Sequence, residues 1–114
     1  MRYALLMCAD ENAVISHEER SRRMAACASF LEQMRERGVL LASEQLHPTQ
    51  TATTVRCWDG GDIMVSDGPF AETREQISGF FIVECKDLDE AIDVATRVPA
   101  AWYGTVEVRP VAGT

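Results

Sequence analysis

The sequence is poor in the residues that most often hold metals. Its only two histidines, His17 and His47, lie far apart, and its four cysteines include no CxxC pair. Structural zinc sites need clustered thiolates or imidazoles, so we expect no metal site. Its paired glycines, Gly60 and Gly61, fit a hairpin turn rather than a loop that leads from a strand into a helix. No nucleotide or flavin fingerprint is therefore present, and we expect no cofactor.

Long apolar runs and excess positive charge are also missing. No run approaches the about 20 apolar residues that cross a bilayer, and the opening segment lacks a signal-peptide cleavage pattern. We therefore expect a cytoplasmic protein that does not bind membranes. Lys and Arg number 11 against 18 Asp and Glu, and this net charge of −7 argues against direct nucleic acid binding. Without an export signal, the four cysteines are expected to be buried free thiols.

The composition is that of one folded domain. Apolar residues make up 46% and charged residues 25% of the 114 residues. This balance supports a hydrophobic core that needs no disulfide or metal. The chain has no internal repeat and no linker-like segment, so we expect a single domain spanning residues 1–114.

The first part of the chain predicts a strand followed by a long helix. Residues 2–8 form an apolar and aromatic run that is typical of a buried strand. Ser16 and Glu19 form a capping-box pattern, in which each side chain binds the other's backbone N–H, and Gly38 is placed to end the helix. The apolar stripe expected to be buried on this helix is Met24, Cys27, Ala28, Leu31 and Met34.

The middle of the chain predicts a strand and a hairpin. Residues 39–46 read as a strand, and the proline in the segment 47–50 indicates a loop. Residues 53–58 and 63–66 alternate as strands, and the Asp-Gly-Gly-Asp segment 59–62 between them is a good hairpin turn.

The last part predicts a central strand, a second helix and a final strand. Residues 79–86 are apolar on both faces, which is typical of a strand inside a sheet. Asp87 caps a helix that ends before Pro99, and residues 105–111 alternate as a strand. The apolar positions of this helix are Leu88, Ala91, Ile92, Ala95 and Val98. The order predicts an α+β sandwich with helices on one face of a mainly antiparallel sheet, so the other face needs water or a partner.

Several motifs in one order carry a family resemblance. DGPFAET begins at Asp67, and GFF, DLDEAI and VEVRP follow it towards the C-terminus. With the opening RYALLM and the segment ERGVLLASEQLHPTQTATTVR, the whole chain resembles the YCII-related family, in the branch named for its DGPF motif. The resemblance implies a ferredoxin-like sandwich that pairs as a homodimer, sheet against sheet, in a dimeric α/β-barrel.

The resemblance says less about function. Some members resemble small lyases or dehydrochlorinases with a histidine on the first helix and an aspartate before a proline. The matching positions here hold Cys27 and Val98, which cannot do the proton chemistry of a His–Asp pair. DGPF-branch proteins often accompany alternative (ECF-type) sigma factors, which implies a noncatalytic regulatory or interaction module as an alternative role.

Asp67 and its neighbours are the main candidate site residues. Asp67 either accepts backbone hydrogen bonds in an Asx-type turn or presents a carboxylate to a cleft, as a ligand contact or general base. Phe70 fits core packing better than stacking on a ligand. His47, in a loop, is the other catalytic candidate because histidine is the commonest general acid or base, whereas His17 is expected to be exposed.

Arginines and aromatics complete the candidates. Arg56 and Arg109 are placed to bind a carboxylate, or to pair with acidic neighbours such as Glu107. Trp102 and Tyr103 either line the mouth of a cleft or help to close the barrel. We expect a small molecule to bind in a cleft near the DGPF turn, at the residues Asp67, Phe70, Arg56 and Tyr103.

Overall fold

The computed structural model describes residues 1–114. The elements in chain order are β1 (Arg2–Ala9), α1 (His17–Glu36), β2 (Leu40–Gln45), the 3-10 turn η1 (Thr49–Thr51), β3 (Thr53–Cys57), β4 (Ile63–Asp67), β5 (Gln76–Glu84), α2 (Leu88–Thr96), α3 (Ala100–Tyr103) and β6 (Thr105–Pro110). The predicted order is confirmed, and η1 and α3 are added to it. None of the helices combines the length and the apolar character needed to span a bilayer.

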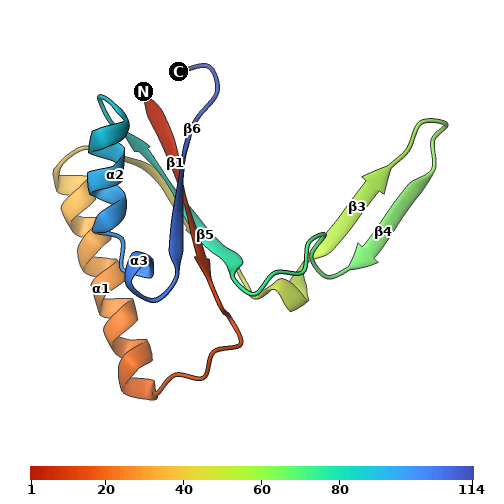
Figure 1. The fold of residues 1–114 in the computed structure, drawn as a ribbon, viewed down its shortest axis with the longest axis horizontal. Helices are drawn as coiled ribbons and strands as arrows, with labels where there is room; N and C mark the ends of the chain where they lie inside the picture. Colours follow the sequence, from red (N-terminus) through yellow and green to blue (C-terminus); the bar gives the residue numbers. More distant parts are fainter.

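Four strands form an antiparallel sheet in the order β2-β5-β1-β6. The three helices cover one face of this sheet and leave the other face open (Figure 1). This arrangement confirms the predicted α+β architecture and the inner position of the apolar strand β5. The strand begins at Gln76 rather than at residue 79, because Gln76 and Ile77 continue the ladder opposite Ala9 and Cys8 beyond a bulge.

Both predicted helix caps are present, with one difference. The Ser16 hydroxyl accepts a hydrogen bond from the Glu19 N–H at 3.0 Å, and an Asp87 carboxylate oxygen accepts from the Glu90 N–H at 2.9 Å. Gly38 follows α1 with a φ of 71°, the left-handed conformation that ends many helices. The Glu19 side chain does not reach back to Ser16 as predicted, because two arginines on the next turn bind its carboxylate.

The core lies between the helices and the covered sheet face. Its buried residues are Tyr3, Leu5, Phe30, Met34, Phe81, Val83, Cys85, Ala91, Val94, Ala95, Val98 and Ala100. The stripe predicted for α1 is only partly right: Met34 is buried, but Met24 and Ala28 are exposed. Phe30, outside that stripe, is buried instead and packs edge-on against Phe81, with ring centroids 5.0 Å apart.

The second helix and the cysteines also differ from the prediction. On α2, Leu88 and Ile92 are about half exposed, and Val94 takes a core position that the stripe missed. All four cysteines are free thiols. Cys85 is buried, but Cys57 is exposed because its strand lies outside the main sheet.

The predicted hairpin forms, but it is not part of the sandwich. Strands β3 and β4 make a separate two-stranded sheet, and Figure 1 shows residues 53–67, which we call the arm, projecting away from the body. The radius of gyration is 16.2 Å, against about 13 Å for a compact chain of this length. The arm is excluded because β2 and β5 pair directly with each other, and the Leu46 N–H donates to the Ser78 carbonyl at 2.8 Å where that ladder ends.

Gly104, between α3 and β6, is a position where a side chain has no room. A Cβ there would lie 2.2 Å from the Cys8 carbonyl oxygen. We expect Gly104→Ala to lower the free energy of unfolding by roughly 1–3 kcal/mol, the cost of overpacking against backbone, measured by urea unfolding. Ser21→Ala is the control, because Ser21 is an exposed residue of α1 and the substitution adds no contact. Equal losses in the two variants would contradict the close contact.

Candidate functional site

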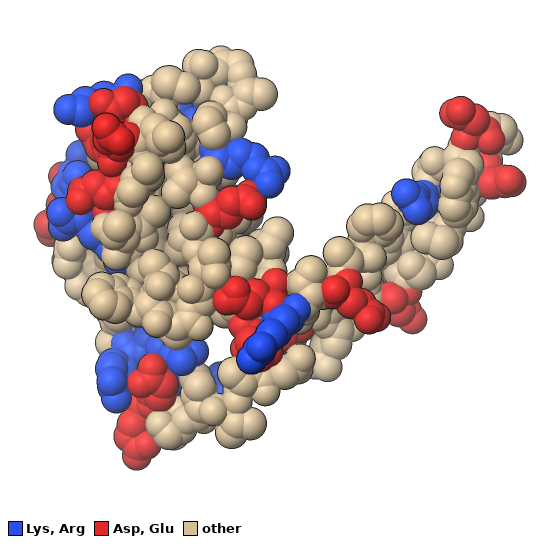
Figure 2. Space-filling view, in the orientation of Figure 1, with Lys and Arg blue, Asp and Glu red and all other residues tan.

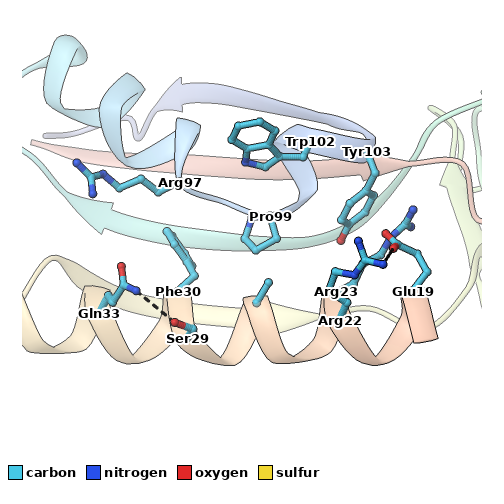
Figure 3. Close-up of a pocket in the computed structure, with 11 residues that line it drawn as sticks. Glu19, Arg22, Arg23, Ser29, Phe30, Gln33, Arg97, Pro99, Trp102 and Tyr103 are labelled. Atoms are coloured by element: carbon cyan, nitrogen blue, oxygen red, sulfur yellow. Dashed lines mark hydrogen bonds and ion pairs between the residues drawn. The ribbon is translucent and has the colours of Figure 1, made fainter. Parts of the chain in front are cut away.

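A groove runs between α1 and the segment formed by α2 and α3 (Figure 3). Its volume is about 420 Å³, within the range of roughly 300–1,000 Å³ that is common for small-molecule sites. The lining residues are Glu19, Arg22, Arg23, Ala26, Ser29, Phe30, Gln33, Arg97, Pro99, Trp102 and Tyr103. Because it lies on the helical side of the sheet, the groove is separate from the open sheet face.

Three guanidinium groups give the groove a positive character. Glu19 Oε1 accepts from Arg23 Nε at 3.0 Å, and Glu19 Oε2 lies 3.3 Å from Arg22 Nη2. On the opposite side, Arg97 Nε lies 3.3 Å from Asp93 Oδ2. Glu19 is the only acidic residue among the lining residues, and it is shared by two arginines. The groove is therefore locally basic, although the chain carries a net charge of −7.

Aromatic rings supply the apolar surface of the groove. Phe30 is only 3% exposed and joins the groove to the core, whereas Trp102 is 84% exposed. The Arg23 guanidinium carbon lies 3.7 Å from the centroid of the Tyr103 ring, a cation–π contact between α1 and α3. Burial raises the pKa of Tyr103, and the nearby Arg23 only partly offsets this effect. The phenol is therefore neutral at pH 7 and able to donate a hydrogen bond.

The groove does not contain the His–Asp pair that the resemblance describes. Burial raises the pKa of the Cys27 thiol, so Cys27 is protonated at neutral pH and is a poor base. Val98, at the position where the resemblance would require an aspartate, is fully buried in the core. The lining residues include no histidine, and the single carboxylate is engaged by arginines. The lining residues supply cationic and aromatic groups that can hold a ligand.

Of the predicted site residues, Tyr103 and its neighbour Trp102 line the groove. Asp67 is the exposed last residue of β4, and the turn after it is held by two hydrogen bonds. The Gly68 N–H donates to the Ala52 carbonyl at 2.8 Å, and the Thr54 hydroxyl donates to the Gly68 carbonyl at 2.8 Å. Gly68 has a φ of 94°, so the DGPF turn needs its glycine. The turn thus lies at the base of the arm and contributes nothing to the groove.

The other predicted residues lie on the surface. Phe70 is 73% exposed, so its expected core position is wrong; the Arg56 guanidinium carbon lies 5.2 Å from the centroid of its ring. Arg109 pairs with Glu107 at 2.6 Å, the simpler of the two predicted roles. His47, in the loop after β2, and His17, at the start of α1, are exposed. The structure therefore brings Arg56 and Phe70 together but not with Tyr103.

The groove arginines were missed by the motif-based prediction. Arg22, Arg23 and Arg97 occur in no recognisable motif, and Arg22 and Arg23 lie off the apolar stripe of α1. A signal was nevertheless present in the helical spacing. Residues 19, 22, 23, 26, 30 and 33 recur at intervals of three and four, which places them on one helix face of mixed polarity. Such a face is typical of a helix that borders a site.

A second hollow lies beside the first at Tyr103. Its volume is about 610 Å³, and its lining residues are Asp10, Thr73, Arg74, Glu75 and Tyr103. Apart from the tyrosine ring it offers only polar groups, and Glu75 already accepts a hydrogen bond from the Thr105 hydroxyl at 2.9 Å. Small-molecule sites are lined mostly by apolar groups, so the groove between the helices is the better candidate.

Comparisons with known proteins agree with this architecture. A solved structure with a TM-score of 0.56 and 14% identity, covering 100% of this chain and 96% of the other, is 5-chloro-2-hydroxyhydroquinone dehydrochlorinase from Burkholderia phenoliruptrix AC1100 in complex with 2,5-dihydroxybenzoquinone. An uncharacterized protein of Rhizobium meliloti (strain 1021) is 40% identical over 116 residues, which cover 98% of this chain and 93% of that protein. The model of the YCII-related domain matches residues 1–113. The chain therefore belongs to the YCII-related family.

Proposed function

We propose that the groove between α1 and α3 binds a small organic anion with a flat apolar body. The observation that carries this proposal is the placement of three guanidinium groups around an aromatic-lined groove. Arg22 and Arg97 stand on opposite walls, where their planar forks suit a carboxylate or phenolate oxygen. Trp102 presents an exposed ring on which a flat ligand can stack, and the buried ring of Phe30 forms the bottom of the groove.

The precedent of a similarly folded protein supports the class of ligand. The structurally similar dehydrochlorinase is in complex with 2,5-dihydroxybenzoquinone, a small flat ring that carries acidic hydroxyl groups. This chain shares the fold but not a His–Asp pair at the matching positions, which hold Cys27 and Val98. We therefore propose binding without dehydrochlorination. A regulatory module that senses such a ligand, acting with an ECF-type sigma factor, is the alternative role predicted from the sequence.

A thermal-shift screen of benzoate, salicylate, related phenolates and 2,5-dihydroxybenzoquinone tests the groove. A compound present at 100 times its Kd adds about 2.7 kcal/mol of stability, which raises Tm measurably. We expect Arg97→Gln and Trp102→Ala to reduce that shift by at least half. Arg20→Gln, on the same helix as Arg22 but outside the groove, should retain the full shift. Equal shifts in all of these variants would place the ligand elsewhere.

The DGPF turn is a second candidate ligand site. Arg56 lies over Phe70 beside it, so a cation and an exposed ring occur together near the Asp67 carboxylate. In this proposal Asp67 contacts a polar group of the ligand, and the turn itself is maintained by Thr54 and Gly68.

The substitution Asp67→Asn tests whether Asp67 contacts a ligand or only supports the turn. Asparagine has nearly the same size as aspartate but carries no charge, and the hydrogen bonds that hold the turn come from Gly68 and Thr54 rather than from the Asp67 side chain. We expect binding of the screened compound to be lost, with stability changed by less than about 1 kcal/mol, as for an exposed substitution. Titration calorimetry and urea unfolding measure the two effects. Unchanged binding, or a large loss of stability, would return Asp67 to a scaffolding role.

The open sheet face supports the proposal of a homodimer that closes an α/β-barrel. Leu6 pairs with Phe80 and Ala4 with Ile82 on this face, and Ile77 beside them is about half exposed. The chain exposes 7991 Å², whereas a compact monomer of this mass exposes about 6,200 Å². The difference, about 1,800 Å² per chain, exceeds the roughly 800 Å² that each partner buries in a standard interface.

Sedimentation equilibrium at micromolar concentration tests the assembly. We expect a species of twice the chain mass of 12.7 kDa that buries at least about 1,200 Å² in total. The sample needs no ligand, because the open face is a property of the fold alone. A single species at 12.7 kDa would rule out the dimer while leaving the groove proposal intact.

A further inference from the structure

The two faces of the arm differ in character. Cross-strand pairing sets Val55 opposite Val65 and Cys57 opposite Ile63, so these four side chains share one face. We call these four residues the apolar face of the arm. The other face carries Thr54, Arg56, Met64 and Ser66. The arm is therefore a two-stranded sheet with one apolar face and one mainly polar face, and the apolar face is suited to packing against another surface.

The apolar face is the more exposed of the two. Val55, Ile63 and Val65 are 62%, 68% and 63% exposed, whereas Thr54 and Met64 on the other face are partly buried. An isolated two-stranded hairpin is at best marginally stable in water. These exposed aliphatic side chains forgo the stabilisation that burial would contribute. The arm therefore lacks the packing that would hold it rigid.

The position of the arm restricts what can cover it. Helices α1 and α2 lie on one side of the sheet, and the arm stands out on the other side, the side of the open face (Figure 1). The space-filling view shows a wide V-shaped opening between the body and the arm (Figure 2). A molecule that covers the open sheet face must enter this opening and meet the arm.

We infer that the apolar face of the arm docks on a second copy of this chain, so that each arm clasps the other protomer. This inference rests on the proposed homodimer and extends it. The excess surface of the two chains is about 3,600 Å² in total, and a dimer that covers both open sheet faces and both arms with it falls in the size range of obligate homodimers. Arg56, the only cation in the arm, lies on the opposite face, and the one carboxylate in register with the apolar face, Asp67, lies at the base of the arm.

Two adjacent substitutions test the clasp. Val65→Asp places a carboxylate in the apolar face, and Ser66→Asp places the same charge on the other face of the same strand. In sedimentation equilibrium we expect Val65→Asp to raise the dimer Kd at least tenfold and Ser66→Asp to change it less than threefold. Because both side chains are exposed, circular dichroism should show that both variants keep the fold. A wild-type dimer that Val65→Asp does not weaken would overturn the clasp and leave the sheet-to-sheet dimer standing.

Photo-crosslinking identifies what the arm touches. Benzoylphenylalanine in place of Ile63 is irradiated in a sample mixed from light and 15N-labelled chains, and the same residue in place of Ser66 is the control. We expect crosslinked peptides that join a light chain to a heavy chain from position 63, and at least fivefold fewer from position 66. Crosslinks within one chain only would show that the arm folds back on its own body and would overturn the inference. Crosslinks in a cell extract that join position 63 to another protein, with none between copies, would overturn it in favour of a regulatory partner.

Discussion

The direct pairing of β2 with β5 is the constraint on which the rest of the structure depends. These strands are separated by 30 residues of chain, from 46 to 75, yet they are neighbours in the sheet. Nothing between them can therefore join the ladder at that point, and the intervening hairpin leaves the body as the arm. The same pairing completes a sheet whose helices all lie on one face. The pairing thus accounts for the arm, and the placement of all the helices on one side accounts for the open face.

Local sequence signals predicted the elements well and their placement poorly. The caps at Ser16 and Asp87 depend on hydrogen bonds across three residues, so the sequence is sufficient to find them. The exclusion of the hairpin from the sheet depends on a contact between distant segments, which no local pattern records. The prediction of which α1 residues are buried was wrong for the same reason, because Phe30 is placed in the core by its contact with Phe81, a residue distant in the sequence.

The candidate site was predicted only in part. Tyr103 was among the candidate residues, and in the structure it lines the groove between the helices rather than a cleft near the DGPF turn. The arginines that give the groove its charge come from α1 and from the end of α2, and only the packing of these helices brings them together. Phe70 was expected in the core because large aromatic residues usually pack there. Its position beyond the end of the main sheet leaves it no core to join, and it stacks against Arg56 instead.

The two tryptophans of the chain have separate surroundings, which has a spectroscopic consequence. Trp102 stands at the mouth of the groove, and Trp58 is half exposed in the turn of the arm. Indole emission shifts to shorter wavelengths when water leaves the ring, so each tryptophan reports on one surface without any added label. A Trp102→Phe chain reports on the arm alone and a Trp58→Phe chain on the groove alone. The intrinsic fluorescence of Trp102 and Trp58 can therefore follow ligand binding in the groove and docking of the arm separately.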